Sequence, residues 1–194
     1  MPDTADLFGE AEAPKALTDR LFFGLFPDAA TAGRIAEEAE ALRRKHGLRS
    51  KAHSPDRFHV TLFHLGDFPG LPKDLVRSSM AAAEATRVAP FEATFDHATS
   101  FAGRPKNRPF ILKGSDERLA DLKACRAALG VSLAKAGVKT TPAFTPHVTL
   151  LYDDPIVEPD PIEPISWTVR ELVLIRSHMG KSIHEPLGRW ALEA

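Results

Sequence analysis

The chain contains the tetrapeptide His-Val-Thr-Leu twice, as His59-Val60-Thr61-Leu62 and as His147-Val148-Thr149-Leu150. Each copy lies in an apolar, β-branched stretch, 58–65 and 144–152, and this composition predicts a β-strand. Successive side chains of a strand point to opposite faces, so the histidine and the threonine of each copy share one face. Each predicted strand therefore presents an imidazole beside a hydroxyl.

Two such pairs supply the groups that cleavage of a phosphodiester needs, namely a base, an acid and two neutral hydrogen-bond donors. Histidine has an unperturbed pKa of about 6.5, so both of its protonation states are accessible near neutrality. Threonine hydroxyls can donate to the non-bridging phosphate oxygens and stabilise charge without a metal. We predict that His59 and His147 are catalytic and that Thr61 and Thr149 bind phosphate.

The composition indicates a globular protein of one domain or of two tightly packed lobes. The 194 residues are 43% hydrophobic and 26% charged, which is enough to bury a sizeable core. A net charge of −1 argues against a duplex nucleic-acid binder and leaves a small anionic ligand or a nucleic-acid end. The single cysteine, Cys125, excludes an internal disulfide and a thiolate metal cage. The apolar run 20–26 is too short to cross a bilayer, so we expect no membrane association and a cytoplasmic protein.

Hydrophobic periodicity predicts three helices and seven strands. Residues 1–17 are predicted to be a mobile tail, and 153–164 and 177–188 to be loops. We predict helices over 28–46, 73–86 and 115–136, and strands over 21–26, 58–65, 91–101, 110–112, 144–152, 167–176 and 189–192. Each half of the chain then holds a strand, a long helix and a His-x-Thr strand. This predicts an α+β fold, 18–194, of two similar lobes that face each other across a cleft.

Four stretches together resemble a known family. They are the opening 20–25 (Arg-Leu-Phe-Phe-Gly-Leu), the block 59–67 that ends in Leu-Gly-Asp, the segment 146–150 (Pro-His-Val-Thr-Leu) and the late strand around 171–174. A lone His-x-Thr is a weak signal, whereas two in β context, the first within a longer block, are specific. The chain resembles the two-histidine (2H) phosphoesterase superfamily, and within it the RNA 2′,3′-cyclic phosphodiesterases, also called 2′-5′ RNA ligases.

The resemblance implies a bilobal fold with two small antiparallel sheets that line the active cleft. It also implies metal-free and cofactor-free hydrolysis of 2′,3′-cyclic phosphates to 2′-phosphates, with reversible 2′-5′ ligation as a possible further activity. His147 is then the base toward water, and His59 the acid toward the 3′ leaving oxygen. One position departs from the family pattern: Tyr152 stands where many members carry a basic residue after the second motif.

Further residues are candidate substrate contacts because they lie near the motifs or in a basic loop. Strand alternation places His64 and Tyr152 on the faces opposite to His59 and His147, unless a bulge turns Tyr152 back. The aromatic candidates are either base-stacking residues or core residues. These candidates are Arg57, Phe58, Arg104, Lys106, Arg108, Phe144 and Tyr152.

Three alternatives remain open for the function. The substrate is either an RNA end or a small cyclic nucleotide such as ADP-ribose 1″,2″-cyclic phosphate, and the chain could instead be a non-catalytic module that binds RNA ends. Eight histidines raise the question of zinc, but no His-x-x-x-His or Cys-x-x-Cys spacing is present, so we expect no metal. We expect a monomer.

Overall fold

The computed structural model describes residues 16–103, 105 and 107–193. Most of the predicted tail and the candidate contacts Arg104 and Lys106 therefore lie outside the described residues. The helices are α1 (Ala29–Lys45), α2 (Lys73–Glu84) and α3 (Ala120–Lys135), with a 3-10 turn η1 (Pro55–Arg57). The strands are β1 (Asp19–Leu25), β2 (Val60–Phe68), β3 (Phe91–Ser100), β4 (Arg108–Lys113), β5 (Val148–Asp153), β6 (Asp160–Val169), β7 (Glu171–His178) and β8 (Ile183–Ala191).

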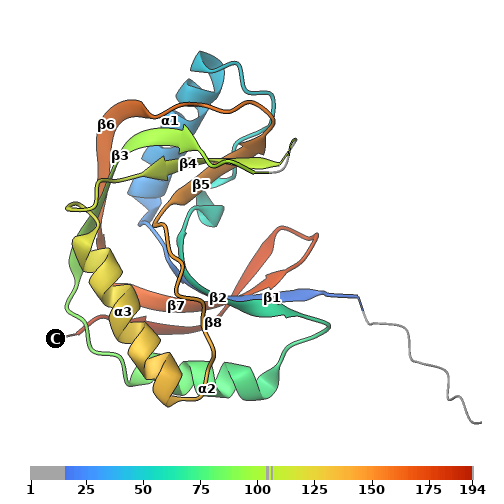
Figure 1. Ribbon diagram of the computed structural model, residues 1–194, viewed down its shortest axis with the longest axis vertical. Coiled ribbons are helices and arrows are strands. Elements are labelled where there is room, and N and C mark those ends of the chain that lie inside the picture. Colours follow the sequence, from blue (N-terminus) through green and yellow to red (C-terminus); the bar gives the residue numbers. More distant parts are fainter. Residues whose placement is uncertain (1–15, 104, 106, 194) are drawn as a thin grey trace, which may run out of the picture.

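The strands form two four-stranded antiparallel sheets, in the orders β2-β1-β7-β8 and β5-β4-β3-β6 (Figure 1). The predicted α+β class is confirmed. The two His-x-Thr motifs introduce β2 and β5, which are both edge strands. These two edge strands contact each other, so the two motifs lie close together although they belong to different sheets.

Helices α1 and α3 connect the two sheets by packing. Helix α1 follows β1 of the first sheet but contacts β6 of the second, and α2 contacts β7 and β8 (Figure 1). Helix α3 contacts β3, and its Arg126 donates from Nε to the carbonyl of Leu62 on β2, at 3.1 Å. The lobes are thus not the two halves of the sequence, because β7 and β8 return to the sheet that β1 began.

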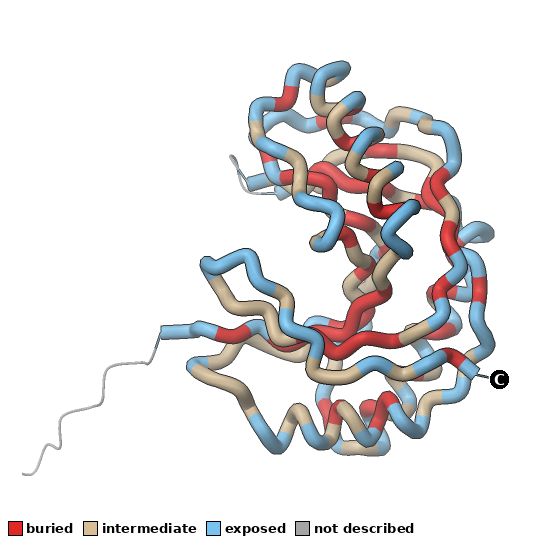
Figure 2. Tube along the Cα trace, turned by 180° about the vertical axis from the view of Figure 1, so that it is seen from behind, coloured by how far each residue is buried: buried red, intermediate tan, exposed pale blue. Residues whose placement is uncertain are grey.

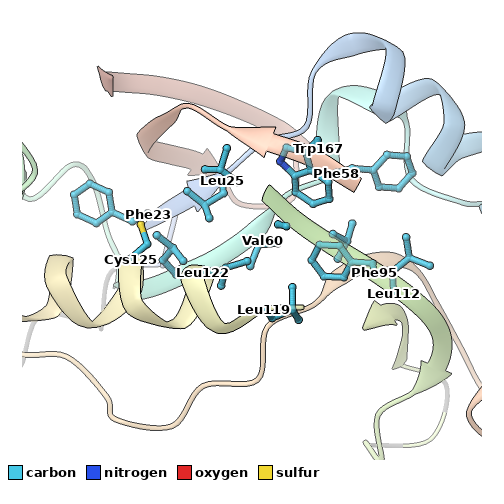
Figure 3. Packing of buried hydrophobic residues seen from close by; sticks show 14 of the residues in the cluster. Phe23, Leu25, Phe58, Val60, Phe95, Leu112, Leu119, Leu122, Cys125 and Trp167 are labelled. Carbon is cyan, nitrogen blue, oxygen red and sulfur yellow. The ribbon is translucent and has the colours of Figure 1, made fainter. Parts of the chain in front are cut away.

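One hydrophobic core joins both sheets. Figure 2 shows that buried positions concentrate in the strands, whereas the outer faces of the helices are exposed. Side chains from both sheets meet α3 in a single cluster (Figure 3). Cys125 of α3 is fully buried there, and burial raises the pKa of its thiol to about 12, as expected of an inert core residue. The labelled members of the cluster are Phe23, Leu25, Phe58, Val60, Phe95, Leu112, Leu119, Leu122, Cys125 and Trp167.

The prediction was wrong over the C-terminal third. The predicted loop 153–164 contains the start of β6, whose prolines Pro161 and Pro164 are tolerated because β6 is an edge strand. The predicted strand 167–176 is two strands in different sheets, since β6 ends at Val169 and β7 begins at Glu171. The predicted loop 177–188 is a β-hairpin, which the sequence does not reveal because β8 is an edge strand without a buried residue and so lacks a clear apolar alternation.

Candidate active site

The two motif histidines precede their strands, and each threonine lies two residues further along the chain. His59 and His147 come directly before β2 and β5, and Thr61 and Thr149 follow on the same faces. All four side chains line one pocket of about 350 Å³, which takes residues from both sheets. The full lining is Arg20, Phe22, His53, Arg57, His59, Thr61, His64, His147, Thr149, Tyr152, Ser177 and His184.

Both imidazoles are held in the same way. Nδ1 of His59 lies 2.7 Å from the carbonyl oxygen of Arg57, and Nδ1 of His147 lies 2.7 Å from that of Thr145. A carbonyl only accepts, so each Nδ1 carries the proton and donates it. This leaves Nε2 of each neutral ring with its lone pair, and Nε2 of His59 accepts from the Thr61 hydroxyl at 3.1 Å. Two rings that present a basic Nε2 are suited to proton transfer.

The surroundings of the two imidazoles lower their pKa values. The ring of His59 stacks on Phe22 at 4.9 Å and on Phe26 at 5.4 Å, and the edge-on ring of His184 is 5.4 Å away. Burial, assisted by neighbouring cationic groups, lowers the pKa of His59 to about 4. Burial likewise lowers the pKa of His147, whose ring meets Phe101 edge-on at 4.9 Å. Both histidines are therefore neutral at pH 7 in the free protein.

A β-bulge in each motif strand reverses the predicted alternation. Thr61 pairs with Gly24 and Phe63 with Phe23, so Leu62 is the extra residue in β2. The bulge buries Leu62 and Phe63 in succession and turns His64 into the pocket. The prediction that His64 lies away from the site was wrong.

The second motif strand repeats this irregularity. Thr149 pairs with Ile111 and Leu151 with Phe110, which leaves Leu150 extra in β5. Leu150 and Leu151 are both buried, and Tyr152 then lines the pocket with Thr149. A bulge was the condition for Tyr152 to face the pocket, and it is present. His64 and Tyr152 occupy equivalent positions in the two strands.

A carboxylate behind the pocket lining neutralises one of the arginines of the pocket. Asp67 accepts from Nε and Nη2 of Arg20 at 2.7 and 2.8 Å and from Nε2 of His64 at 2.9 Å. The hydrogen bonds from Arg20 hold the pKa of Asp67 well below its usual range. Asp67 is not among the lining residues itself, so it orients Arg20 and His64 from behind.

The other predicted contacts lie away from this pocket. Phe58 is 0% exposed in the core, so of its two alternatives core packing applies and base stacking does not: η1 turns it inward ahead of the strand. Phe144 packs on the core under the Arg126 guanidinium, 4.5 Å from its ring centroid. Arg108 pairs with Asp154 at 3.0 Å in a separate hollow. Arg57 and Tyr152 are the predicted contacts that line the pocket.

Besides His64, four residues of the pocket were not expected from the sequence, namely Arg20, Phe22, Ser177 and His184. Arg20 and Phe22 alternate on β1, and the alternation of that run was a signal that could have found them. Ser177 and His184 come from the β7–β8 hairpin, which was taken for a loop. His53, which precedes the first motif, also lines the pocket, because its backbone N–H donates to the Leu150 carbonyl at 2.8 Å and this bond attaches residues 51–54 to the second motif strand.

Neither a metal cluster nor a membrane span is found in the part of the chain that the structure describes. Across residues 16–103, 105 and 107–193, no three His, Cys, Asp or Glu side chains gather in a way that could hold a metal ion. No helix of those residues combines the length and the apolar character needed to cross a membrane.

Comparison with known families identifies the fold and the motifs. The family model of the 2′-5′ RNA ligase superfamily matches residues 31–181. The chain belongs to the 2′-5′ RNA ligase superfamily. The resemblance inferred from the two His-x-Thr motifs is thereby confirmed, and this superfamily member is a 2H phosphoesterase by fold.

Solved structures agree with this assignment. A crystal structure of E. coli LigT in apo form is 28% identical, covers 92% of this chain and 100% of its own, and has a TM-score of 0.70. E. coli LigT complexed with 3′-AMP is 27% identical over 91% of this chain and 99% of its own, with a TM-score of 0.69. A structure described only as a phosphoesterase is 25% identical over 91% and 99%, with a TM-score of 0.69. A search of curated proteins found no match.

Proposed function

We propose that this superfamily member hydrolyses 2′,3′-cyclic phosphodiesters, at RNA ends or on nucleotides, to 2′-phosphates, and that it also catalyses reversible 2′-5′ ligation, in which a 5′-hydroxyl attacks the cyclic phosphate in place of water. The observation that carries the proposal is the duplicated unit of the pocket. Each unit is an imidazole fixed through Nδ1 by a carbonyl two residues upstream, with a threonine hydroxyl on the same face. Phosphoesterase activity is also what the family and its solved members support.

The two units divide the chemistry between them. His147 takes a proton from water through Nε2 as the water oxygen attacks phosphorus, and the bond from phosphorus to the ribose O3′ then breaks. His59 gives a proton to that departing oxygen, which leaves a 2′-phosphate. Thr61 and Thr149 donate to the non-bridging oxygens, whose negative charge grows in the transition state. An acid or a base so placed contributes about 10²–10⁴-fold in rate.

Protonation of His59 is coupled to substrate binding in this mechanism. Its pKa of about 4 keeps the ring neutral in the free protein at pH 7. A cyclic phosphodiester is a monoanion, and its charge beside Nε2 favours the imidazolium in a pocket of low dielectric. Binding of the substrate thus favours the protonated form of His59 that acts as the acid.

A nucleotide is a suitable occupant of the pocket. E. coli LigT has been crystallised with 3′-AMP, so a member of the same superfamily accommodates a nucleoside monophosphate. A pocket of about 350 Å³ lies within the size range of sites for small ligands. We extend this binding mode to the present chain as part of the proposal.

The test is product identification with matched histidine variants. The protein is incubated in EDTA with 2′,3′-cyclic AMP and with an RNA that ends in a cyclic phosphate, and the products are identified by phosphorus NMR. We expect a 2′-phosphate, and a loss of rate of at least about 10²-fold in His59→Ala and in His147→Ala. His97→Ala is the control, because His97 pairs with Asp96 and does not line the pocket.

Two outcomes would contradict the proposal in different ways. Turnover that EDTA abolishes, or that survives in both histidine variants, would reject the metal-free acid–base pair. No turnover of either substrate, with RNA still bound and circular dichroism showing folded protein, would indicate a module that binds RNA ends without catalysis.

A further inference from the structure

The lining of the catalytic pocket is rich in arginine and histidine for a nearly neutral chain. It contains two arginines and five of the eight histidines of the sequence, but none of its aspartates or glutamates. The net charge of the whole chain is only −1. The basic groups are therefore concentrated where an anion would bind.

The two arginines of the pocket differ in how their charge is compensated. Arg20 is held by the Asp67 carboxylate in a bidentate pair. Within the described residues, Arg57 forms no ion pair, and its Nε is buried without a hydrogen-bond partner. Its charge acts on three imidazoles of the pocket, since it contributes to the lowered pKa values of His53, His59 and His184.

A partly buried guanidinium without a carboxylate is costly unless an anion from outside the protein completes it. Arg57 presents a planar fork of donors, which matches a phosphate group. The scissile phosphate already has four partners in the two His-x-Thr units. The charge of Arg57 is thus left for another anionic group.

A second hollow beside the catalytic pocket has room for that group. It measures about 250 Å³ and is formed by the β7–β8 turn. Arg20, Arg57 and Ser177 line both this hollow and the catalytic pocket, so the two are continuous past these side chains. The remaining lining is His178, Met179, Gly180 and Ser182.

We propose that Arg57, assisted by the Ser177 hydroxyl, binds a second phosphate of the substrate in this hollow. The inference rests on the proposed function and narrows its substrate class. The substrate then carries a phosphate next to the cyclic one, either the phosphodiester of the preceding RNA nucleotide or the pyrophosphate of a nucleotide derivative. A cyclic mononucleotide lacks that phosphate and leaves Arg57 without an anion.

The test compares kcat and KM for three substrates. They are 2′,3′-cyclic AMP, an adenosine dinucleotide that ends in a 2′,3′-cyclic phosphate, and ADP-ribose 1″,2″-cyclic phosphate. The protein variants are the native chain, Arg57→Gln, Arg57→Lys and Arg44→Gln. Arg44 is exposed on α1 and serves as the matched control for loss of one guanidinium.

We expect Arg57→Gln to raise KM for substrates with the second phosphate roughly 10–100-fold more than for cyclic AMP, since a charge-assisted contact of that kind is lost. Any effect of Arg57 on the pocket histidines acts on all three substrates alike, so it cancels in the ratio of their KM values. Arg57→Lys should recover part of the loss, and Arg44→Gln should behave as the native protein. If Arg57→Gln raises KM selectively for the dinucleotide alone, the second phosphate is that of an RNA end. If it raises KM selectively for the ADP-ribose compound alone, the second phosphate is a pyrophosphate.

An equal loss on all three substrates would overturn the second-phosphate site while leaving the proposed function intact. Failure of the native protein to turn over any of them would instead reject the proposed function. If Arg57→Gln does not fold, measurements on the native protein alone still test the second-phosphate site. Its kcat/KM ratio of dinucleotide to cyclic AMP should exceed roughly 10 and fall between ~50 and ~500 mM KCl, because salt screens the added charge pair. A ratio near one that does not vary with salt contradicts the inference.

Discussion

The carbonyl contacts of the two catalytic candidates give their rings the same tautomer, but different side chains surround the two rings. His59 is enclosed by Phe22, Phe26 and the edge of His184, whereas His147 meets Phe101. Burial lowers the pKa of both imidazoles. The acid and base forms needed for turnover therefore coexist at acidic rather than neutral pH.

The pH dependence of kcat/KM follows from these shifts. One histidine must be protonated and the other neutral, so activity is lost at high pH as the higher of the two pKa values is passed. Since both pKa values lie below about 6.5, we expect a bell-shaped profile whose alkaline limb also lies below about 6.5. A steady-state profile with 2′,3′-cyclic AMP measures this directly.

A matched variant checks the origin of the acidic limb. His184→Gln removes a cationic neighbour that lowers the pKa of His59, so the acidic limb should move to higher pH. An alkaline limb above pH ~7.5 in the native protein would contradict the assigned environment of the histidines.

At the scale of the element, the paired bulges decide which side chains line the pocket. The extra residues Leu62 and Leu150 bury two apolar side chains in succession and expose the fifth residue after each motif histidine to the pocket. That fifth residue is His64 in β2 and Tyr152 in β5. The duplicated strands therefore differ in polarity at one matched position.

A substitution at Tyr152 tests whether this position contacts the substrate. Tyr152 is 42% exposed, so a long side chain fits without loss of core packing. We expect Tyr152→Arg to lower KM for the cyclic dinucleotide by roughly 3–10-fold, through a charge-assisted contact with phosphate. Tyr152→Phe is the control for loss of the hydroxyl alone. An unchanged KM in Tyr152→Arg would show that the substrate does not reach the end of β5.

At the scale of the whole molecule, α3 and the shared core fix the positions of the two motif strands relative to each other. Arg126 of α3 donates to the Leu62 carbonyl on β2 and to the Thr141 carbonyl ahead of β5, at 3.1 and 2.7 Å. Its guanidinium also lies 4.3 Å from the Phe63 ring centroid. The pocket geometry thus depends on the packing of a helix that contributes no side chain to the pocket.

A core substitution in α3 tests this coupling. Leu122 is 0% exposed in the cluster that joins both sheets (Figure 3). We expect Leu122→Ala to lower the free energy of unfolding by about 2–5 kcal/mol, through lost burial and the cavity that remains. Because one core serves both sheets, urea unfolding should show a single transition in the variant as in the native protein.

Val131→Ala is the control on the same helix, because Val131 is 56% exposed and its truncation should change the free energy of unfolding by less than about 0.5 kcal/mol. Two separate transitions in Leu122→Ala would show that the sheets unfold independently and would reject the shared core.

Local rules were sufficient for the motifs and for the elements with strong periodicity. The pairing of each histidine with a threonine on one face depends only on strand alternation. The Asp28 cap of α1 depends on one side chain near the helix start, and its Oδ1 accepts from the Thr31 N–H at 2.9 Å. Such features involve neighbours along the chain, so the sequence predicts them.

The sequence by itself determined the candidate catalytic groups, namely two histidines and two threonines on two strands. Only the tertiary structure decided the rest of the pocket. The bulges that bring in His64 and Tyr152 depend on the pairing of β2 with β1 and of β5 with β4. His184 joins because β8 completes the sheet that β1 began. These placements depend on hydrogen bonds between residues far apart in the chain, and local periodicity does not record such partners.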